Sequence, residues 1–123
     1  MIVHLTEAET WNQAVERGEL MAASVHTEGF AHCSTVAQIL GVANRFYRAR
    51  SGLVLLAIDE TKLTAPLRWE APAHPDDSAS SPAGDQFPHV YGAIDITAVI
   101  DVVPIVASGG GEFSPDQIPG TWS

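Results

Sequence analysis

The sequence predicts a single α+β domain in which short strands and two main helices share one core. Of the 123 residues, 46% are hydrophobic and 17% are charged, a composition typical of one globular domain. Two segments carry apolar residues at helical spacing, and several others are short runs of β-type residues. No internal repeat and no second domain is visible, so we predict a single domain.

Charge and hydropathy exclude several classes of function. Fifteen acidic and six basic residues give a net charge of −9, and this field argues against a nucleic-acid partner. The longest mostly apolar run, residues 53–58, is far shorter than the roughly 20 residues of a membrane-spanning helix, so we expect no membrane role. One cysteine cannot form an internal disulfide and no secretory signal is visible. We therefore expect a cytoplasmic protein.

The first elements are predicted from local patterns. Residues 2–5 form a β-type run, and Thr6 with Glu9 has the spacing of a capping box that opens a helix. Gly18 is suited to end that helix in a left-handed conformation. Residues 19–29 have mixed composition and are predicted to form a loop with a short turn or strand.

The middle of the chain predicts a strand, a helix and a central strand. Residues 30–33 are β-type, and Thr35 with Gln38 is a second candidate capping box. The apolar stripe that follows, as far as Tyr47, predicts the second helix. Residues 53–59 are apolar on both faces, which is typical of a strand in the centre of a sheet.

The last third combines two β-type regions with two polar segments. Residues 67–70 and 94–105 are predicted strands. Residues 71–86 offer almost nothing to bury and are predicted to form a mobile surface loop. Residues 107–123, rich in glycine and proline, are predicted to be a weakly ordered tail.

Three histidines stand out because they occur inside or beside β-type segments. His4, His32 and His89 must each find a hydrogen-bond partner there. For any one of them a structural role is the simpler interpretation, but three such positions favour a shared pocket. Their spacing matches no metal-binding motif, so we predict no metal site.

Three further residues could carry chemistry. In an extended strand Ser34 shares a face with His32, and it is a candidate nucleophile, ligand contact or helix cap. Cys33 lies on the other face and is predicted to be a buried apolar residue. Glu70 ends a predicted strand, where it could bind a ribose hydroxyl or simply pair with Arg68.

Residues 87–92, Phe-Pro-His-Val-Tyr-Gly, interrupt polar sequence with two aromatic residues and a histidine. Pro88 restricts Phe87 to extended backbone, and we expect Phe87 to be an apolar anchor. If the segment is extended, His89 and Tyr91 lie on one face and are available to a ligand.

Several of these stretches together resemble a known family. The resemblance is carried, in order, by residues 2–6, 11, 28–35, 55–59, 69–70 and 87–92. Over about residues 1–106 the chain resembles the bacterial domain-of-unknown-function family 952 (DUF952). Its most specific strings here are Gly-Phe-x-His-Cys-Ser and Phe-Pro-His-x-Tyr-Gly.

That family is similar in fold to the ADP-ribosyltransferase group, which includes the tRNA 2′-phosphotransferases. The resemblance implies an ADP-ribosyltransferase-like split antiparallel β-core with two main helices around a cleft for NAD. Residues 32–59 look like the phosphotransferases' segment of His-Leu-Ser, helix, apolar strand and Asp. Their Arg-His-Gly motif has no counterpart near His4, and their basic surface is replaced by the net charge of −9, which argues against a tRNA substrate.

The resulting hypothesis is a protein that binds NAD or a related nucleotide and acts at its ribose. The resemblance and the residue types together suggest two groups: catalytic residues His4, Ser34 and Glu70, and ligand-binding residues His32, His89 and Tyr91. In this hypothesis Glu70 bonds a ribose hydroxyl and stabilises an oxocarbenium-like centre, and Tyr91 stacks on nicotinamide. The alternatives are a non-catalytic module that binds a metabolite or a protein in the same cleft, and a hydrolase that uses a Ser34–His32 pair.

Overall fold

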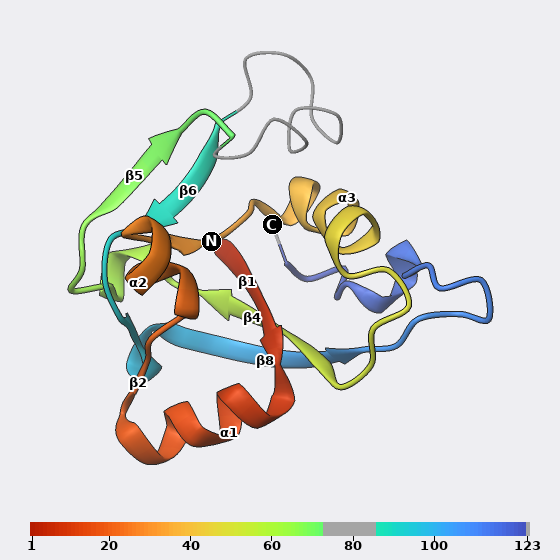
Figure 1. Cartoon of the computed structure of the whole chain (residues 1–123), viewed down its shortest axis with the longest axis horizontal. Coiled ribbons are helices and arrows are strands. Elements are labelled where there is room, and N and C mark those ends of the chain that lie inside the picture. The colour runs from red at the N-terminus through yellow and green to blue at the C-terminus, as the bar shows by residue number, and fades with distance from the viewer. Residues whose placement is uncertain (73–85, 123) are drawn as a thin grey trace.

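The structure is a computed structural model that describes residues 1–72 and 86–122. Strands and helices combine in the α+β arrangement that the sequence predicts (Figure 1). The described strands form two three-stranded sheets and one two-stranded sheet, all antiparallel. The predicted mobile loop over residues 71–86 lies, for residues 73–85, outside the described part of the chain.

The central sheet contains the most buried strand of the protein. β4 (Leu53–Ile58) lies between β1 (Ile2–Glu7) and β8 (Val99–Ile105), antiparallel to both. All six residues of β4 are buried, because both faces of the sheet are covered by other elements. The prediction of a central strand is confirmed.

The first helix, α1 (Ala8–Arg17), begins without the predicted capping box. Thr6 belongs to β1 and pairs with Val54, and the N-cap residue is Glu7, whose side chain makes no capping bond. The capping-box prediction is therefore wrong here, since sheet pairing commits the backbone of Thr6 to an extended form. Gly18 does end α1, with a φ of 86° in the left-handed region.

The segment predicted as a loop contains a second helix. β2 (Glu19–Leu20) pairs with β7 (Ile94–Asp95), and α2 (Ala23–Glu28) follows. Gly29, with a φ of 94°, ends α2 and turns the chain toward the two-residue strand β3 (Ala31–His32). The turn at Gly29 therefore sets how α2 leads into β3.

The helix α3 (Val36–Phe46) begins as predicted. The Thr35 hydroxyl accepts a hydrogen bond of 3.1 Å from the Gln38 amide, and the Gln38 side chain accepts one of 3.0 Å from the Thr35 amide. This reciprocal pair is the predicted capping box. Ile39 and Ala43 pack this helix against the central sheet.

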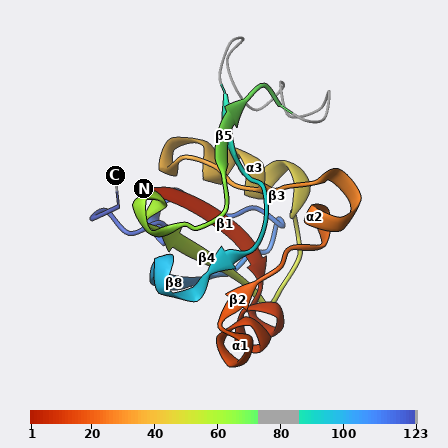
Figure 2. The ribbon, with the colours of Figure 1, turned by 90° about the vertical axis from the view of Figure 1, so that its left-hand side faces the viewer.

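The second three-stranded sheet is smaller and lies beside the first (Figure 2). β6 (Phe87–Val90) is buried throughout and is flanked by β3 and β5 (Leu67–Glu70). A backbone bridge between Val3 and Ser34 joins the two sheets, with hydrogen bonds of 2.7 and 2.8 Å. We call the sheet of β3, β6 and β5 the pocket sheet.

The C-terminal residues pack against the domain. In the segment predicted as a weakly ordered tail, Phe113 and Trp122 are buried in the cluster that includes α3 and β4. The Asn44 side chain exchanges two hydrogen bonds with the backbone of Phe113. Short 3₁₀ helices span Glu60–Lys62, Ile96–Ala98 and Pro115–Gln117. Within the described ranges, no helix has the length and apolar character needed to cross a membrane.

Candidate functional site

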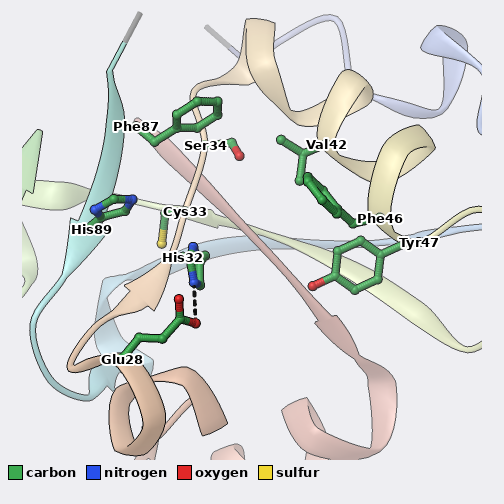
Figure 3. Close-up of a pocket in the computed structure, with 9 residues that line it drawn as sticks. All are labelled: Glu28, His32, Cys33, Ser34, Val42, Phe46, Tyr47, Phe87 and His89. Atoms are coloured by element: carbon green, nitrogen blue, oxygen red, sulfur yellow. Dashed lines mark hydrogen bonds and ion pairs between the residues drawn. The ribbon is translucent and has the colours of Figure 1, made fainter. Parts of the chain in front are cut away.

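A cavity of about 280 Å³ lies between the pocket sheet and α3 (Figure 3). Its wall is built by the end of α2, the strand β3 with the residues after it, the second half of α3, and β6. The lining residues are Glu28, His32, Cys33, Ser34, Val42, Phe46, Tyr47, Phe87 and His89. Histidines and a carboxylate thus face aromatic side chains from α3 across one space.

His89 is the most constrained polar residue of this wall. It is 2% exposed, and its ring stacks on that of Phe30 with 4.1 Å between centroids. Its Nδ1 lies 2.9 Å from Oε1 of Glu70, and the Tyr91 hydroxyl donates to the same oxygen. Glu70 reaches His89 because β5 and β6 pair with Glu70 opposite Phe87, so that Glu70 is diagonal to His89 on one face.

These contacts fix the roles of the two ring nitrogens of His89. A carboxylate oxygen can only accept, so Nδ1 carries the proton and donates it to Glu70. Among the described residues, Nε2 of His89 has no hydrogen-bond partner. Every fully buried side-chain nitrogen or oxygen in this part of the chain has a partner, so Nε2 must be accessible from outside the protein core. Since His89 lines the cavity, the unpartnered Nε2 is open to that space.

The same hydrogen bonds set the charge of Glu70 and Tyr91. Donation by Tyr91, and then by His89, lowers the pKa of Glu70 below its usual value. The hydrogen bond to this carboxylate raises the pKa of Tyr91. At neutral pH Glu70 is therefore ionised and Tyr91 keeps its proton, which is the state in which the hydrogen bonds can form.

His32 contributes a second histidine–carboxylate pair. Its Nε2 lies 2.9 Å from Oε2 of Glu28, four residues earlier across the turn at Gly29 (Figure 3). The rings of His32 and His89 are 5.7 Å apart between centroids, and Phe30 contacts both. Two histidines, each bound to a carboxylate, therefore share one side of the cavity.

His4 supports this wall without lining the cavity. Its Nδ1 donates to the carbonyl oxygen of His32 over 2.6 Å. Burial lowers the pKa of His4, so the imidazole is neutral at neutral pH. The structure therefore assigns His4 to holding β3 against the central sheet.

Ser34 and Cys33 differ in what they offer. Thr35, and not Ser34, caps α3, which leaves the Ser34 hydroxyl at the cavity. Within the described residues no hydrogen bond joins this hydroxyl to a histidine, the geometry that a Ser34–His32 hydrolase would need. Burial raises the pKa of Cys33 to about 12, so its thiol is not a nucleophile at neutral pH.

The six predicted site residues form one connected group. His32, Ser34 and His89 line the cavity. The other three lie behind it, because His4 bonds to His32, Glu70 to His89, and Tyr91 to Glu70.

Glu28, Phe46 and Tyr47 line the cavity but are not among the site residues predicted from sequence. Glu28 could have been predicted from its position four residues before His32, with Gly29 providing the turn between them. Phe46 and Tyr47 belong to the apolar stripe predicted for the second helix, but Phe46 is 40% exposed and lines the cavity. In residues 1–72 and 86–122 no cluster of three or more His, Cys, Asp or Glu side chains could hold a metal ion.

Comparisons with known proteins agree with this architecture. A family model described as "Protein of unknown function (DUF952)" matches residues 5–102. The crystal structure of protein CC0527 from Caulobacter crescentus has a TM-score of 0.77, 26% identity and 92% coverage of both chains. The solution NMR structure of CC0527 has a TM-score of 0.70, 27% identity, and coverage of 89% of this chain and 88% of that one. No curated protein matches the chain.

Proposed function

The chain belongs to the DUF952 family, and we propose that its cavity binds NAD or a related nucleotide and acts at the ribose. One observation carries the proposal. The buried His89 presents an open Nε2 to a cavity whose opposite side is aromatic. A nucleoside needs such a combination, since its base is a flat ring and its sugar carries hydroxyl groups.

The size and the lining of the cavity suit part of a dinucleotide. At about 280 Å³ it lies just below the range for small-molecule pockets, roughly 300–1,000 Å³. A base with its ribose would occupy it, with the ring against Phe46, Tyr47 or Phe87. The Arg50 guanidinium lies 5.0 Å from the Tyr47 ring and 3.7 Å from the Glu7 carboxylate, so in the proposal a pyrophosphate at this end would compete with Glu7 for this charge.

We extend the proposal to the fold: the resemblance in sequence implies an ADP-ribosyltransferase-like architecture. The described strands divide into separate antiparallel sheets beside a cavity, and this arrangement is compatible with the split β-core of the proposal. In that framework the cavity corresponds to the NAD cleft.

The proposed reaction breaks the bond between nicotinamide and C1′ of the ribose. The electron pair of that bond leaves with nicotinamide, and the oxygen of water or of an acceptor hydroxyl bonds to C1′. Nε2 of His89 takes the proton of that oxygen and passes it to solvent. With water the products are nicotinamide, ADP-ribose and one proton.

The geometry changes three of the roles expected from sequence, beginning with His4, which bonds to the backbone of His32 and does not line the cavity. Glu70 bonds to His89 and Tyr91, so in the proposal it supports His89 and does not contact the ribose. Tyr91 bonds to Glu70 and is not assigned to stacking on nicotinamide. His32 and Ser34, which line the cavity, are the proposed contacts to the ribose.

Calorimetric titration with NAD, ADP-ribose and nicotinamide tests the binding step. His89→Asn keeps a polar side chain but removes the imidazole, and we expect about tenfold weaker binding of ADP-ribose. His26→Ala, at an exposed position of α2, is the matched control and should bind like the unaltered protein. If none of the three compounds binds, the proposal is overturned.

A non-catalytic binding module is the second candidate. It is favoured by the state of the two carboxylates, because Glu28 and Glu70 are each already bonded to a histidine. Incubation with NAD, followed by chromatography of released nicotinamide, separates the two candidates. Release that is lost in His89→Asn supports the enzyme, and binding without release supports the module.

A further inference from the structure

We infer that the cavity recognises its ligand through a hydroxyl or N–H group that donates to Nε2 of His89, with Glu70 and Tyr91 as positioning residues. The inference rests on the proposed function only for the identity of the natural ligand. The state of the His89 ring is a property of the free protein and can be measured without it.

Two contacts fix the orientation of the His89 ring. His89 is held by the hydrogen bond of 2.9 Å to Glu70 and by stacking on Phe30 at 4.1 Å. Rotation of the ring by 180° would place a carbon where Nδ1 now meets the carboxylate, leaving Glu70 without this donor. The buried ring is therefore held in one orientation.

The hydrogen bond to Glu70 also determines the tautomer of His89. Which ring nitrogen of a neutral histidine carries the proton is set by the hydrogen bond that the other makes. In the neutral ring, donation from Nδ1 to Glu70 leaves Nε2 with a lone pair, and Nε2 is open to the cavity. A carbonyl or carboxylate oxygen of a ligand would be repelled there, because both this oxygen and Nε2 carry a lone pair and neither has a proton to donate. A hydroxyl or N–H group, such as the hydroxyls of ribose, would form a hydrogen bond.

Tyr91 holds the Glu70 carboxylate in its position beside His89. The Glu70 side chain is 37% exposed, so on its own it could turn toward water. The Tyr91 hydroxyl bonds the same oxygen that accepts from His89, and the Arg68 guanidinium lies 4.9 Å from the Tyr91 ring. Tyr91 thus fixes the carboxylate, and the carboxylate fixes His89.

Nitrogen-15 NMR of the histidine rings tests the inference in the free protein. The His89 signals are identified by their loss in His89→Asn. We expect a protonated Nδ1 and an unprotonated Nε2. Glu70→Ala should move the Nε2 signal toward the protonated position, and Tyr91→Phe should move it less. Glu70→Gln, whose amide oxygen can still accept from Nδ1, should restore the original signal.

Glu28→Gln is the matched control, because it alters the other histidine–carboxylate pair and should leave the His89 signals in place. A His89 ring that is protonated at Nε2 in the unaltered protein overturns the inference. So does a spectrum that Glu70→Ala leaves unchanged.

Ligand probes complete the test. ADP-ribose and D-ribose carry hydroxyl donors, whereas acetone offers only an acceptor. We expect the donors to shift the Nε2 signal and acetone to leave it unmoved, with ADP-ribose bound about tenfold more weakly by Glu70→Ala. A signal that no donor moves overturns the inference. A response to D-ribose without binding of ADP-ribose supports the inference and overturns the proposed nucleotide function.

Discussion

Each of the two three-stranded sheets has a fully buried central strand, but burial serves a different purpose in the two sheets. β4 in the central sheet contributes six apolar residues, and its neighbour β1 carries one buried histidine, His4, which is neutral. β6 in the pocket sheet is equally buried, but it contains His89 with a carboxylate partner and an open nitrogen. Burial in the central sheet stabilises the fold by removing apolar surface from water. Burial in the pocket sheet holds polar atoms in place.

The largest effect is expected from the central sheet. Leu56, at the middle of β4, is 0% exposed, and Leu56→Ala should lower the free energy of unfolding by about 3–4 kcal/mol. Ile100→Ala, at a position 52% exposed on β8, is the control, with a change of about 0.5 kcal/mol or less. Denaturant unfolding measures both. Equal losses in the two variants would contradict the assignment of the core to β4.

Phe87 tests whether the pocket sheet also contributes to stability. Its side chain is buried and lines the cavity, so Phe87→Ala should cost about 3 kcal/mol and enlarge the cavity. Tyr91→Phe, which removes only the hydroxyl on Glu70, should leave the free energy of unfolding nearly unchanged. If the two variants melt at the same temperature, the contrast between anchor and positioning residue is wrong.

A smaller, pH-dependent effect is expected at Glu70. Its pKa is lower in the folded protein than the usual value of 4.5, so the ionised carboxylate stabilises the fold. This contribution is fully present above about pH 4.5 and is lost as the pH falls through the lower folded pKa. The stability difference between the unaltered protein and Glu70→Gln should therefore shrink on acidification below that value. Urea unfolding across this range measures it, and a difference that grows on acidification would contradict the prediction.

The smallest effect is expected at Cys33. Its buried thiol has a pKa of about 12, so iodoacetamide at neutral pH should leave the folded protein unmodified. Protein unfolded in urea is the control and should be alkylated at once. Mass spectrometry measures both reactions. Rapid alkylation of the folded protein would show that the wall of the cavity opens.

The sequence predicted secondary structure best where one local rule acted alone. Thr35 and Gln38 form the predicted capping box because Thr35 belongs to no strand, so its backbone is free to begin the helix. Thr6 with Glu9 has the same pattern, but pairing of β1 with β4 extends the strand through Glu7. Long-range pairing of this kind is invisible to a four-residue motif.

Composition misled where a few large side chains outweighed many small ones. Residues 107–123 are rich in glycine and proline, yet Phe113 and Trp122 are buried and tie the segment to α3 and β8. The helix α2 was missed because its six residues have no apolar stripe to recognise.

For the candidate site, residue types predicted which side chains lie together, but they did not predict the role of each one. Polar residues in β-type segments had to be satisfied, and this condition brought His4, His32, His89 and Glu70 into one group. Which members line the cavity depends on the register of β5 against β6, and on β3 being only two residues long. Neither quantity is encoded in a local pattern.

The bridge between Val3 and Ser34 has a consequence for the thermodynamics of binding. Residues 32–34 are clamped on one side by β1 and on the other by the Pro88 carbonyl, which accepts from the Cys33 amide over 3.1 Å. A wall ordered before the ligand arrives loses little conformational entropy on binding. The amide protons of Val3 and Ser34 should then exchange with deuterium only when the two sheets separate, and their exchange rates would report the rigidity of the cavity from within the core.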